Sequence, residues 1–378
     1  MNGGPRPARV LLACSGLEHT HRGFESFARE CFEVLRDEPL LDLELVKASG
    51  PDGDRERAVR ALKRDDGLAR ALGRLWHGAL QVEQLAFAIS LQREILRRRP
   101  DVIYFSEWYT GKGLAALRKL NRQQYALVLS NGSMLAEGFD QFDRVHQHTG
   151  PMLEYVLAKG ADPAKHILLP VAFDISPVAD IATAEERRAL RRRLSLPTDR
   201  TILISVAALN RTHKRLDYVI EEVARLPEPR PFLLLVGAPE PEAGGIRSIA
   251  AELLGDDGHS IRTVPRPEVD LLLRASDMFV LASLAEGLPR ALVEAMAHGL
   301  PCLAHDYAVA DYAMGGYGRL ADFRQRGALT GLLEQSPNGR NEPAERHRFV
   351  YENFSWDRLK PRYVEMLHGA VGRADFAT

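Results

Sequence analysis

The chain has little cysteine and almost no net charge, and each shortage excludes a class of protein. Only three of the 378 residues are cysteines, Cys14, Cys31 and Cys302, and none forms a CxxC pair. This usage argues against a disulfide framework and against a cysteine zinc site. The formal net charge of −1 argues against a nucleic-acid binder that depends on phosphate contacts. We therefore expect no nucleic-acid partner.

Long apolar runs are also missing. No stretch approaches the roughly 18 residues that cross a bilayer, and no apolar core follows the first basic residues as in a signal peptide. We expect a cytoplasmic protein without a transmembrane segment. Two arginine clusters, at 97–99 and 191–193, suit helix ends where cations complement the dipole. Weak peripheral contact with an anionic membrane is the alternative reading of these clusters.

What the sequence does contain is an alternation of short apolar runs and longer amphipathic stretches. Uninterrupted apolar strands between helices are typical of parallel sheets covered on both faces. The expected strands of the first half are 10–13, 41–46, 102–105, 126–129 and 167–169. Residues 55–99 are expected to be helical throughout, with a break near Gly67 or Gly73.

A second series of the same kind follows a stretch without periodicity. This stretch, 172–183, contains Pro177 and is the expected linker. The expected strands beyond it are 202–206, 232–236, 261–264, 278–282 and 302–304. The sequence thus predicts an α/β protein with two Rossmann-like, doubly wound domains that face a central cleft, where ligands bind beyond the carboxyl ends of the strands.

The most informative segment is the strand ending at Ala282 with the helix that follows it. Pro289 suits the first helical position, and Gly299 ends the helix. The free amides of the helix start form an expected phosphate site at the edge of a sheet. Glu286 and Glu294 bracket this position, and a carboxylate that accepts two neighbouring hydroxyls can hold a ribose. The structural alternative for Glu286 is a carboxylate that only complements the helix dipole. For Glu294 it is a position on a solvated helix face.

This segment resembles the signature of the retaining GT-B fold glycosyltransferases of family 4. Residues 286–289 read Glu-Gly-Leu-Pro, and residues 294–301 read Glu-Ala-Met-Ala-His-Gly-Leu-Pro. The resemblance covers residues 200–310 well and the amino-terminal half loosely. It implies that Glu294 binds the nucleotide ribose and that Glu286 contacts the transferred sugar. It also implies that the backbone of Gly287 and Leu288 holds the distal phosphate.

A group of basic side chains opens the helix expected at 216–226: Arg211, His213, Lys214 and Arg215. Cations at a helix start oppose the dipole, so their clustering calls for an anion. Lys214 matches the family lysine that neutralises the departing diphosphate. The family arginine would fall at 208 or 209, so Arg211 is a candidate replacement. A solvated basic loop is the alternative.

The resemblance also implies site roles for residues outside these two segments. Gly23 best matches the glycine-rich loop that closes on the donor phosphate, where a backbone approaches without a side chain. Arg266 follows the strand at which relatives hold the base. Asn131 stands where many relatives have a histidine near the reacting carbon, and an asparagine cannot shuttle protons at neutral pH. Either no base is needed there, or another group serves, for which the candidates are Glu107 with Trp108, and His146 or His148.

The function implied by the resemblance is retaining transfer of a hexosyl or amino-hexosyl unit from a nucleotide-diphosphate sugar, with a UDP-sugar favoured, to a hydroxyl acceptor. The acceptor is a small molecule or glycan, as in natural-product or cell-surface glycan biosynthesis. No Asp-x-Asp pair directly follows an expected strand, so we expect neither metal nor cofactor. The alternatives are a sugar-nucleotide epimerase and a catalytically silent nucleotide-sugar-binding protein.

The expected division of the chain follows from this assignment. Residues 1–175 form the acceptor-side domain, and residues 176–355 form the nucleotide-sugar-binding domain. Residues 356–378 form the family's final helix, which crosses back toward the first domain.

Overall fold

The computed structural model describes residues 6–19, 23–75, 78–132, 137–335 and 342–372. The chain divides into two compact units. One unit comprises the residues up to Asp174 together with the stretch from Trp356, and the other comprises Ile175–Ser355.

The first unit is built on a seven-stranded sheet with the order β3-β2-β1-β4-β5-β6-β7. All neighbouring strands pair in parallel. The strands are β1 (Ala8–Cys14), β2 (Leu41–Lys47), β3 (Glu56–Ala58), β4 (Val102–Phe105), β5 (Ala126–Asn131), β6 (Arg144–Gln147) and β7 (His166–Leu168). The central strands β1, β4 and β5 are almost entirely buried, which explains their uninterrupted apolar sequences.

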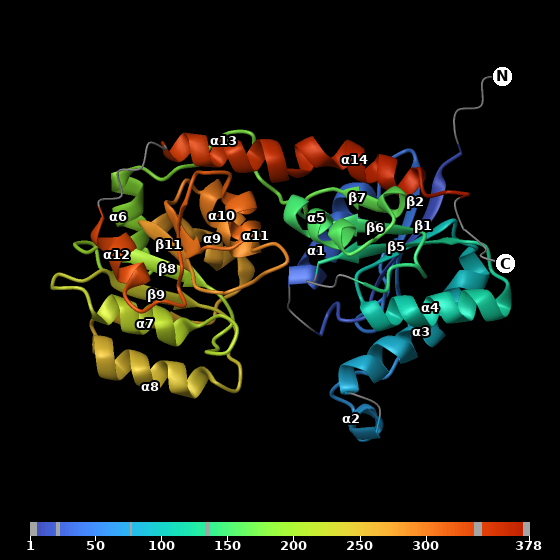
Figure 1. Ribbon diagram of the computed structural model, residues 1–378, viewed down its shortest axis with the longest axis horizontal. Helices are drawn as coiled ribbons and strands as arrows, with labels where there is room; N and C mark the ends of the chain where they lie inside the picture. The colour runs from blue at the N-terminus through green and yellow to red at the C-terminus, as the bar shows by residue number, and fades with distance from the viewer. Residues whose placement is uncertain (1–5, 20–22, 76–77, 133–136, 336–341, 373–378) are drawn as a thin grey trace. The chain divides into compact units, whose positions relative to one another are not determined.

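Helices cover this sheet, with α3 and α4 lying side by side (Figure 1). The helices of the first unit are α1 (Gly23–Leu35), α2 (Gly67–Leu75), α3 (Ala79–Arg98), α4 (Trp108–Asn121), α5 (Gly150–Ala158), the short 3-10 helix at Pro163–Lys165 and α14 (Trp356–His368). α14 packs on α1, β1 and β2, and its Tyr363 hydroxyl donates a 2.8 Å hydrogen bond to the Pro170 carbonyl. The end of the chain is therefore part of the first unit.

The second unit contains a six-stranded parallel sheet with the order β10-β9-β8-β11-β12-β13. Its strands are β8 (Ile202–Val206), β9 (Phe232–Val236), β10 (His259–Arg262), β11 (Met278–Leu281), β12 (Cys302–His305) and β13 (Arg319–Ala321). The prediction of two parallel-sheet α/β domains is confirmed.

The helices of the second unit are α6 (Ala184–Arg193), α7 (Leu216–Ala224), α8 (Ala243–Leu254), α9 (Arg266–Ala275), α10 (Arg290–Ala297), α11 (Ala308–Met314), α12 (Ala328–Glu334) and α13 (Pro343–Phe354). α7 and α8 lie side by side (Figure 1). The inward faces of α7 and α8 join strand side chains such as Leu203, Leu233 and Val280 in one core. This core fixes the positions of the loops at the sheet edge.

Three parts of the sequence-based prediction are wrong in detail. Residues 55–99 are not helical throughout: β3 occupies Glu56–Ala58 and pairs with β2, and the helices α2 and α3 begin later. Strands β6 and β13 were not predicted, because each is short and polar residues interrupt it. Pro289 is the N-cap of α10 rather than its first residue.

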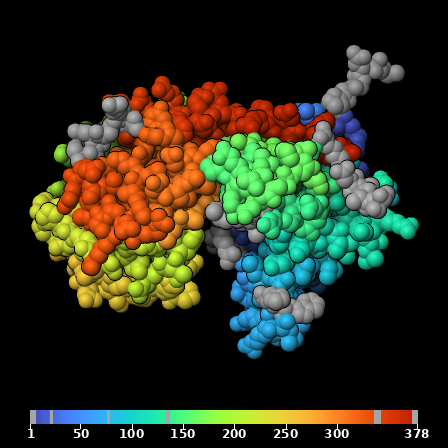
Figure 2. Space-filling model, viewed as in Figure 1, coloured from blue at the N-terminus to red at the C-terminus, as the bar shows by residue number. Residues whose placement is uncertain are grey.

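Helix α2 presents apolar side chains to solvent. Leu68, Leu72 and Leu75 are spaced by four and three residues, and their exposed fractions are 57%, 38% and 79%. Arg70 and Arg74 lie on the same short helix, which has no acidic residue in its first turn. The segment around α2 projects from the rest of the first unit (Figure 2).

Candidate functional site

The order of strands in the second sheet reverses between β8 and β11, which are neighbours. In doubly wound sheets, ligands bind outside the carboxyl ends of the strands at such a point, because the following loops diverge there. The loops that leave β8 and β11 are 207–215 and 282–289. They contain most of the site residues expected in this half of the chain.

Asn210 fixes the loop after β8. Its Oδ1 accepts hydrogen bonds from the backbone N–H groups of His213 (3.1 Å) and Lys214 (2.7 Å), and its Nδ2 donates to Glu240 Oε2 at 2.8 Å. Asn210 is buried, with 6% of its surface exposed. The backbone at Lys214 is therefore held in place. The sequence reading missed Asn210, although an asparagine after a strand is a common turn former.

Lys214 and Glu286 meet across the two loops. The Lys214 ammonium forms an ion pair with Glu286 Oε1, and the two side chains are 19% and 15% exposed. The ring of His213 is hydrogen-bonded to the Ala285 carbonyl at 3.1 Å, which joins the loops a second time. The structure thus brings together two predicted site residues that are 72 positions apart.

The start of α10 presents unbonded backbone donors. Within the described residues, the N–H groups of Gly287 and Leu288 have no hydrogen-bond acceptor. Both residues are partly exposed, and the N-cap Pro289 follows them. Free amides at the positive end of a helix are suited to an anion.

Glu294 lies one turn inside α10 and is 7% exposed. Its carboxylate pairs with the Arg266 guanidinium at two places, Nη1 to Oε2 at 2.7 Å and Nη2 to Oε1 at 2.5 Å. Arg290 Nη2 lies 3.7 Å from the same Oε1. Two residues predicted to bind the nucleotide are thus in direct contact, and Arg266 orients the buried carboxylate.

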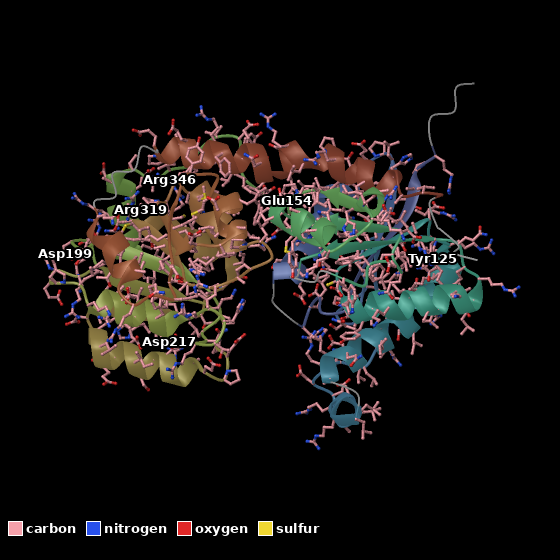
Figure 3. The ribbon with its side chains drawn as sticks, viewed as in Figure 1. Tyr125, Glu154, Asp199, Asp217, Arg319 and Arg346 are labelled. Atoms are coloured by element: carbon pink, nitrogen blue, oxygen red, sulfur yellow. The ribbon has the colours of Figure 1, made fainter. Side chains whose placement is uncertain are left out.

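Arg211 has its own partner in the chain. Its Nε donates to Asp217 Oδ2 on α7 at 3.1 Å, and its backbone N–H donates to Glu242 Oε2 at 2.6 Å. Asp217 is labelled on α7 in Figure 3. About half of the Arg211 side chain is exposed. The Asp217 carboxylate therefore already neutralises the Arg211 guanidinium, so the charge of Arg211 is balanced within the protein.

Two hydroxyl groups near this edge were missed by the sequence reading. Ser283 Oγ and Tyr307 Oη are buried and have no hydrogen-bond partner among the described residues. Burial raises the pKa of Tyr307, and the nearby charge of Glu286 raises it further. Buried polar groups in native proteins are usually paired, so unpaired hydroxyls beside Glu286 indicate positions for ligand atoms. Only the tertiary structure identifies them, since serine and tyrosine are common residues.

Gly23 and Asn131 lie in the first unit. Gly23 is exposed and begins α1. Asn131 ends β5 and is 3% exposed, and its Nδ2 donates to Gln147 Oε1 at 3.0 Å. The Asn131 amide is therefore part of a buried polar network at the carboxyl edge of the first sheet.

The three alternative bases are all buried. His146 is hydrogen-bonded to Tyr104 Oη at 2.7 Å and to the Leu169 carbonyl at 2.5 Å, and burial lowers its pKa to about 4. His148 is hydrogen-bonded to Ser130 Oγ at 2.8 Å, and burial lowers its pKa well below the usual range. Glu107 accepts several hydrogen bonds, considered below. His146 is engaged at both ring nitrogens, which suits a core histidine rather than a proton acceptor.

Among the described residues, no three His, Cys, Asp or Glu side chains gather in a way that could hold a metal ion. In the same part of the chain, no helix is both long and apolar enough to cross a membrane.

Known proteins resemble parts of this chain. The family model described as "Glycosyl transferases group 1" matches residues 186–349. The chain is 34% identical to EpsF of Bacillus subtilis (strain 168) over 142 residues, which are 37% of this chain and 35% of that protein. It is 28% identical to the MMP alpha-(1->4)-mannosyltransferase of Mycolicibacterium hassiacum over 183 residues, 46% of this chain and 44% of that protein. The chain thus spans less than half the length of these curated relatives.

Solved structures extend the similarity to the whole fold. The sucrose-phosphate synthase of Thermosynechococcus elongatus matches with a TM-score of 0.77 and 17% identity over 96% of this chain and 98% of that one. Alr3699/HepE of Anabaena, in complex with UDP-glucose, matches with a TM-score of 0.75 and 15% identity over 96% and 100%. The chain has the fold of the GT-B glycosyltransferases. Residues 186–349, which lie in the second unit, are similar to the family described as "Glycosyl transferases group 1".

Proposed function

We propose that the protein is a retaining glycosyltransferase of the family 4 type. In this proposal it moves a hexosyl or amino-hexosyl unit from a nucleotide-diphosphate sugar, with UDP favoured, to a hydroxyl acceptor. The observation that carries the proposal is the Lys214–Glu286 ion pair at the strand-order reversal of the second sheet, beside the free amides of Gly287 and Leu288. The UDP-glucose complex of Alr3699/HepE supports a nucleotide-sugar donor.

The proposed chemistry uses charges that this chain provides. The Lys214 ammonium and the Gly287 and Leu288 amides would stabilise the diphosphate as it leaves, which lowers the barrier to ionisation of the sugar–phosphate bond. The acceptor hydroxyl would then attack from the same face and give its proton to the departing phosphate. With a cation and a helix start at the leaving group, we propose that no metal is required.

The remaining residues have binding roles in this proposal. Glu294, oriented by Arg266, would hold the ribose hydroxyls, and Glu286 would contact the transferred sugar. Gly23 and Asn131 would contribute from the acceptor-side unit, which residues 1–175 and the helix from Trp356 form. We further propose a cytoplasmic location, with any membrane contact limited to a weak peripheral one.

The proposal is tested with the whole protein and a panel of UDP-, GDP- and other nucleotide sugars. We expect a thermal shift with one class of nucleotide and stereoretentive transfer to a hydroxyl acceptor, undiminished by a metal chelator. Isomerised donor in the absence of acceptor would instead indicate the epimerase, and binding without any turnover would indicate the silent binding protein. A nucleotide complex with the base and ribose away from Glu294 would contradict the site.

A further inference from the structure

The first sheet has a strand-order reversal of its own, between the neighbouring strands β1 and β4. Ser15 follows β1 directly, and Glu107 follows β4 by two residues as the N-cap of α4. In doubly wound sheets, ligands bind beyond the carboxyl ends of the strands where the strand order reverses. We therefore expect a ligand of the first unit to bind beyond the carboxyl ends of β1 and β4. Three carboxylates gather there, Glu25, Glu83 and Glu107, which we call the carboxylate cluster.

Glu107 organises the loop that leaves β1. Its Oε1 accepts hydrogen bonds from the Ser15 amide and hydroxyl, both at 2.7 Å, and from the Gly16 amide at 3.3 Å. Its Oε2 accepts from Thr110 Oγ1 at 2.7 Å. Burial raises the pKa of Glu107, and these hydrogen bonds oppose the rise. No cation among the described residues is paired with this carboxylate.

Glu83 is the member of the cluster that has a cation. Its Oε2 accepts from the backbone N–H and the Nε of Arg64 at 2.7 and 3.0 Å, and its Oε1 pairs with Arg64 Nη2 at 2.5 Å. Ser15 Oγ lies 3.3 Å from Glu83 Oε1, and His19 Nε2 lies 3.5 Å from Oε2. Ser15 therefore links Glu83 to Glu107.

Glu25 is the third member of the carboxylate cluster. Only 8% of its surface is exposed, and its Oε2 has no hydrogen-bond partner among the described residues. Its carboxylate lies against Gly16, where a Cβ atom would overlap Oε1. A glutamate in the first turn of a helix ordinarily complements the dipole, but that role leaves the oxygen accessible to water. A buried oxygen without a donor is destabilising, and a donor on a ligand would remove that cost.

The charges of the cluster do not balance. Hydrogen bonding to Glu83 raises the pKa of Arg64, and the charges of Glu83, Glu25 and Glu107 all raise it further. Three carboxylates thus act on one guanidinium, which is already bonded to Glu83. An anionic acceptor would be repelled here, and a cationic one would be attracted.

We propose that the carboxylate cluster binds the acceptor through an ammonium group, so that the acceptor is an amino sugar or a similar polyhydroxylated amine, and that Glu25 determines this specificity. The inference rests on the proposed glycosyltransferase function and narrows its acceptor class. Glu25 accepts from the ammonium group, while the acceptor hydroxyl that is glycosylated remains a separate group of the same molecule.

The test compares a matched pair of acceptors, glucosamine and glucose, with the whole protein at neutral pH. UDP binding and acceptor-independent hydrolysis of the UDP-sugar are measured in parallel as readouts of the donor side. We expect glucosamine to be bound and used about tenfold better than glucose, since a charge-assisted hydrogen bond replaces a neutral one. Glu25→Gln keeps the shape and removes the charge, so it should abolish the preference and leave UDP binding unchanged.

Glu18→Gln is the matched control, because Glu18 lies on the loop that leaves β1, seven residues before Glu25, but its side chain is 40% exposed and pairs with Arg29 at 2.7 Å. It should retain the preference for glucosamine. Equal use of the two sugars, use of neither, or an equal loss in Glu18→Gln would overturn the inference even if UDP binding is intact. Failure of every nucleotide sugar to bind would instead overturn the proposed function.

Discussion

The Lys214 ammonium is ion-paired with the Glu286 carboxylate, across the strand-order reversal of the second sheet. Both side chains are mostly buried, and the Lys214 backbone is fixed by Asn210. The cation is therefore positioned before any ligand arrives. A charge fixed in advance needs little reorganisation when negative charge develops on a leaving group, which is how such groups lower barriers.

Replacement of this cation should impair the chemical step. We expect Lys214→Met to lower kcat by about 100- to 1000-fold, since a single preorganised donor contributes on that order. The measurement is steady-state transfer with saturating donor. Lys360→Met is the control, because Lys360 pairs with Glu38 on the first unit and should leave kcat within about twofold. An unchanged kcat in Lys214→Met would remove Lys214 from the catalytic group.

The Arg266–Glu294 pair should control donor affinity rather than chemistry. Glu294→Gln weakens both the bond to Arg266 and the expected bonds to the ribose, so the donor KM should rise about tenfold with little change in kcat. Titration calorimetry with the nucleotide diphosphate measures the same loss directly. Glu252→Gln, on the exposed face of α8, provides the control. Equal affinities of the two variants would contradict a ribose contact at Glu294.

Removal of the Tyr307 hydroxyl should distinguish a role in ligand binding from a role in stability. Tyr307→Phe removes a buried oxygen that has no hydrogen-bond partner in the part of the chain that the structure describes, so the thermal stability should not fall. If the hydroxyl bonds to the transferred sugar, kcat/KM for the donor should fall about tenfold while the affinity for UDP alone is kept. A drop in Tm with unchanged kinetics would show that the hydroxyl has a structural role instead.

Asp277 should act only on stability. Its Oδ2 accepts from the Ile202 amide at 2.7 Å and pairs with Arg191 at 2.5 Å, and its Oδ1 pairs with Arg187 at 3.1 Å. Asp277→Asn should therefore destabilise the second unit by about 2–3 kcal/mol, seen as a lower Tm. Donor KM should not change. The exposed neighbour Asp199, labelled in Figure 3, gives the control variant Asp199→Asn, which should keep the wild-type Tm.

The buried histidines predict a pH dependence of stability. Burial lowers the pKa of His146 from 6.5 to about 4, so the unfolded chain binds a proton more readily than the folded one. The contribution of His146 should be complete above about pH 6.5 and should fall by roughly 3 kcal/mol toward pH 4. Urea unfolding at several pH values, followed by a signal from the first unit, measures this slope. His146→Gln should reduce the slope, and the part that remains is assigned to His148, whose pKa is also lowered by burial. An equal slope in His146→Gln and the wild type would exclude a contribution from His146.

The fold class could be predicted because the buried strands are read directly from the sequence. Strands such as Val102–Phe105 and Phe232–Val236 are continuous apolar runs, since both faces of a parallel sheet are covered. The short strands β3, β6 and β13 could not be predicted. Their residues are polar or partly exposed, and they become strands because a neighbour pairs with them.

The sequence by itself determined the strand–loop–helix segment around Glu286 and Glu294, because local turn and helix signals are short-range. The tertiary structure alone decided that Lys214 meets Glu286 and that Arg266 meets Glu294, since sheet order brings distant loops together. It also decided which polar groups are left unpaired, such as Glu25 and Tyr307. Burial and hydrogen bonding depend on all the surrounding elements at once, which no local pattern records.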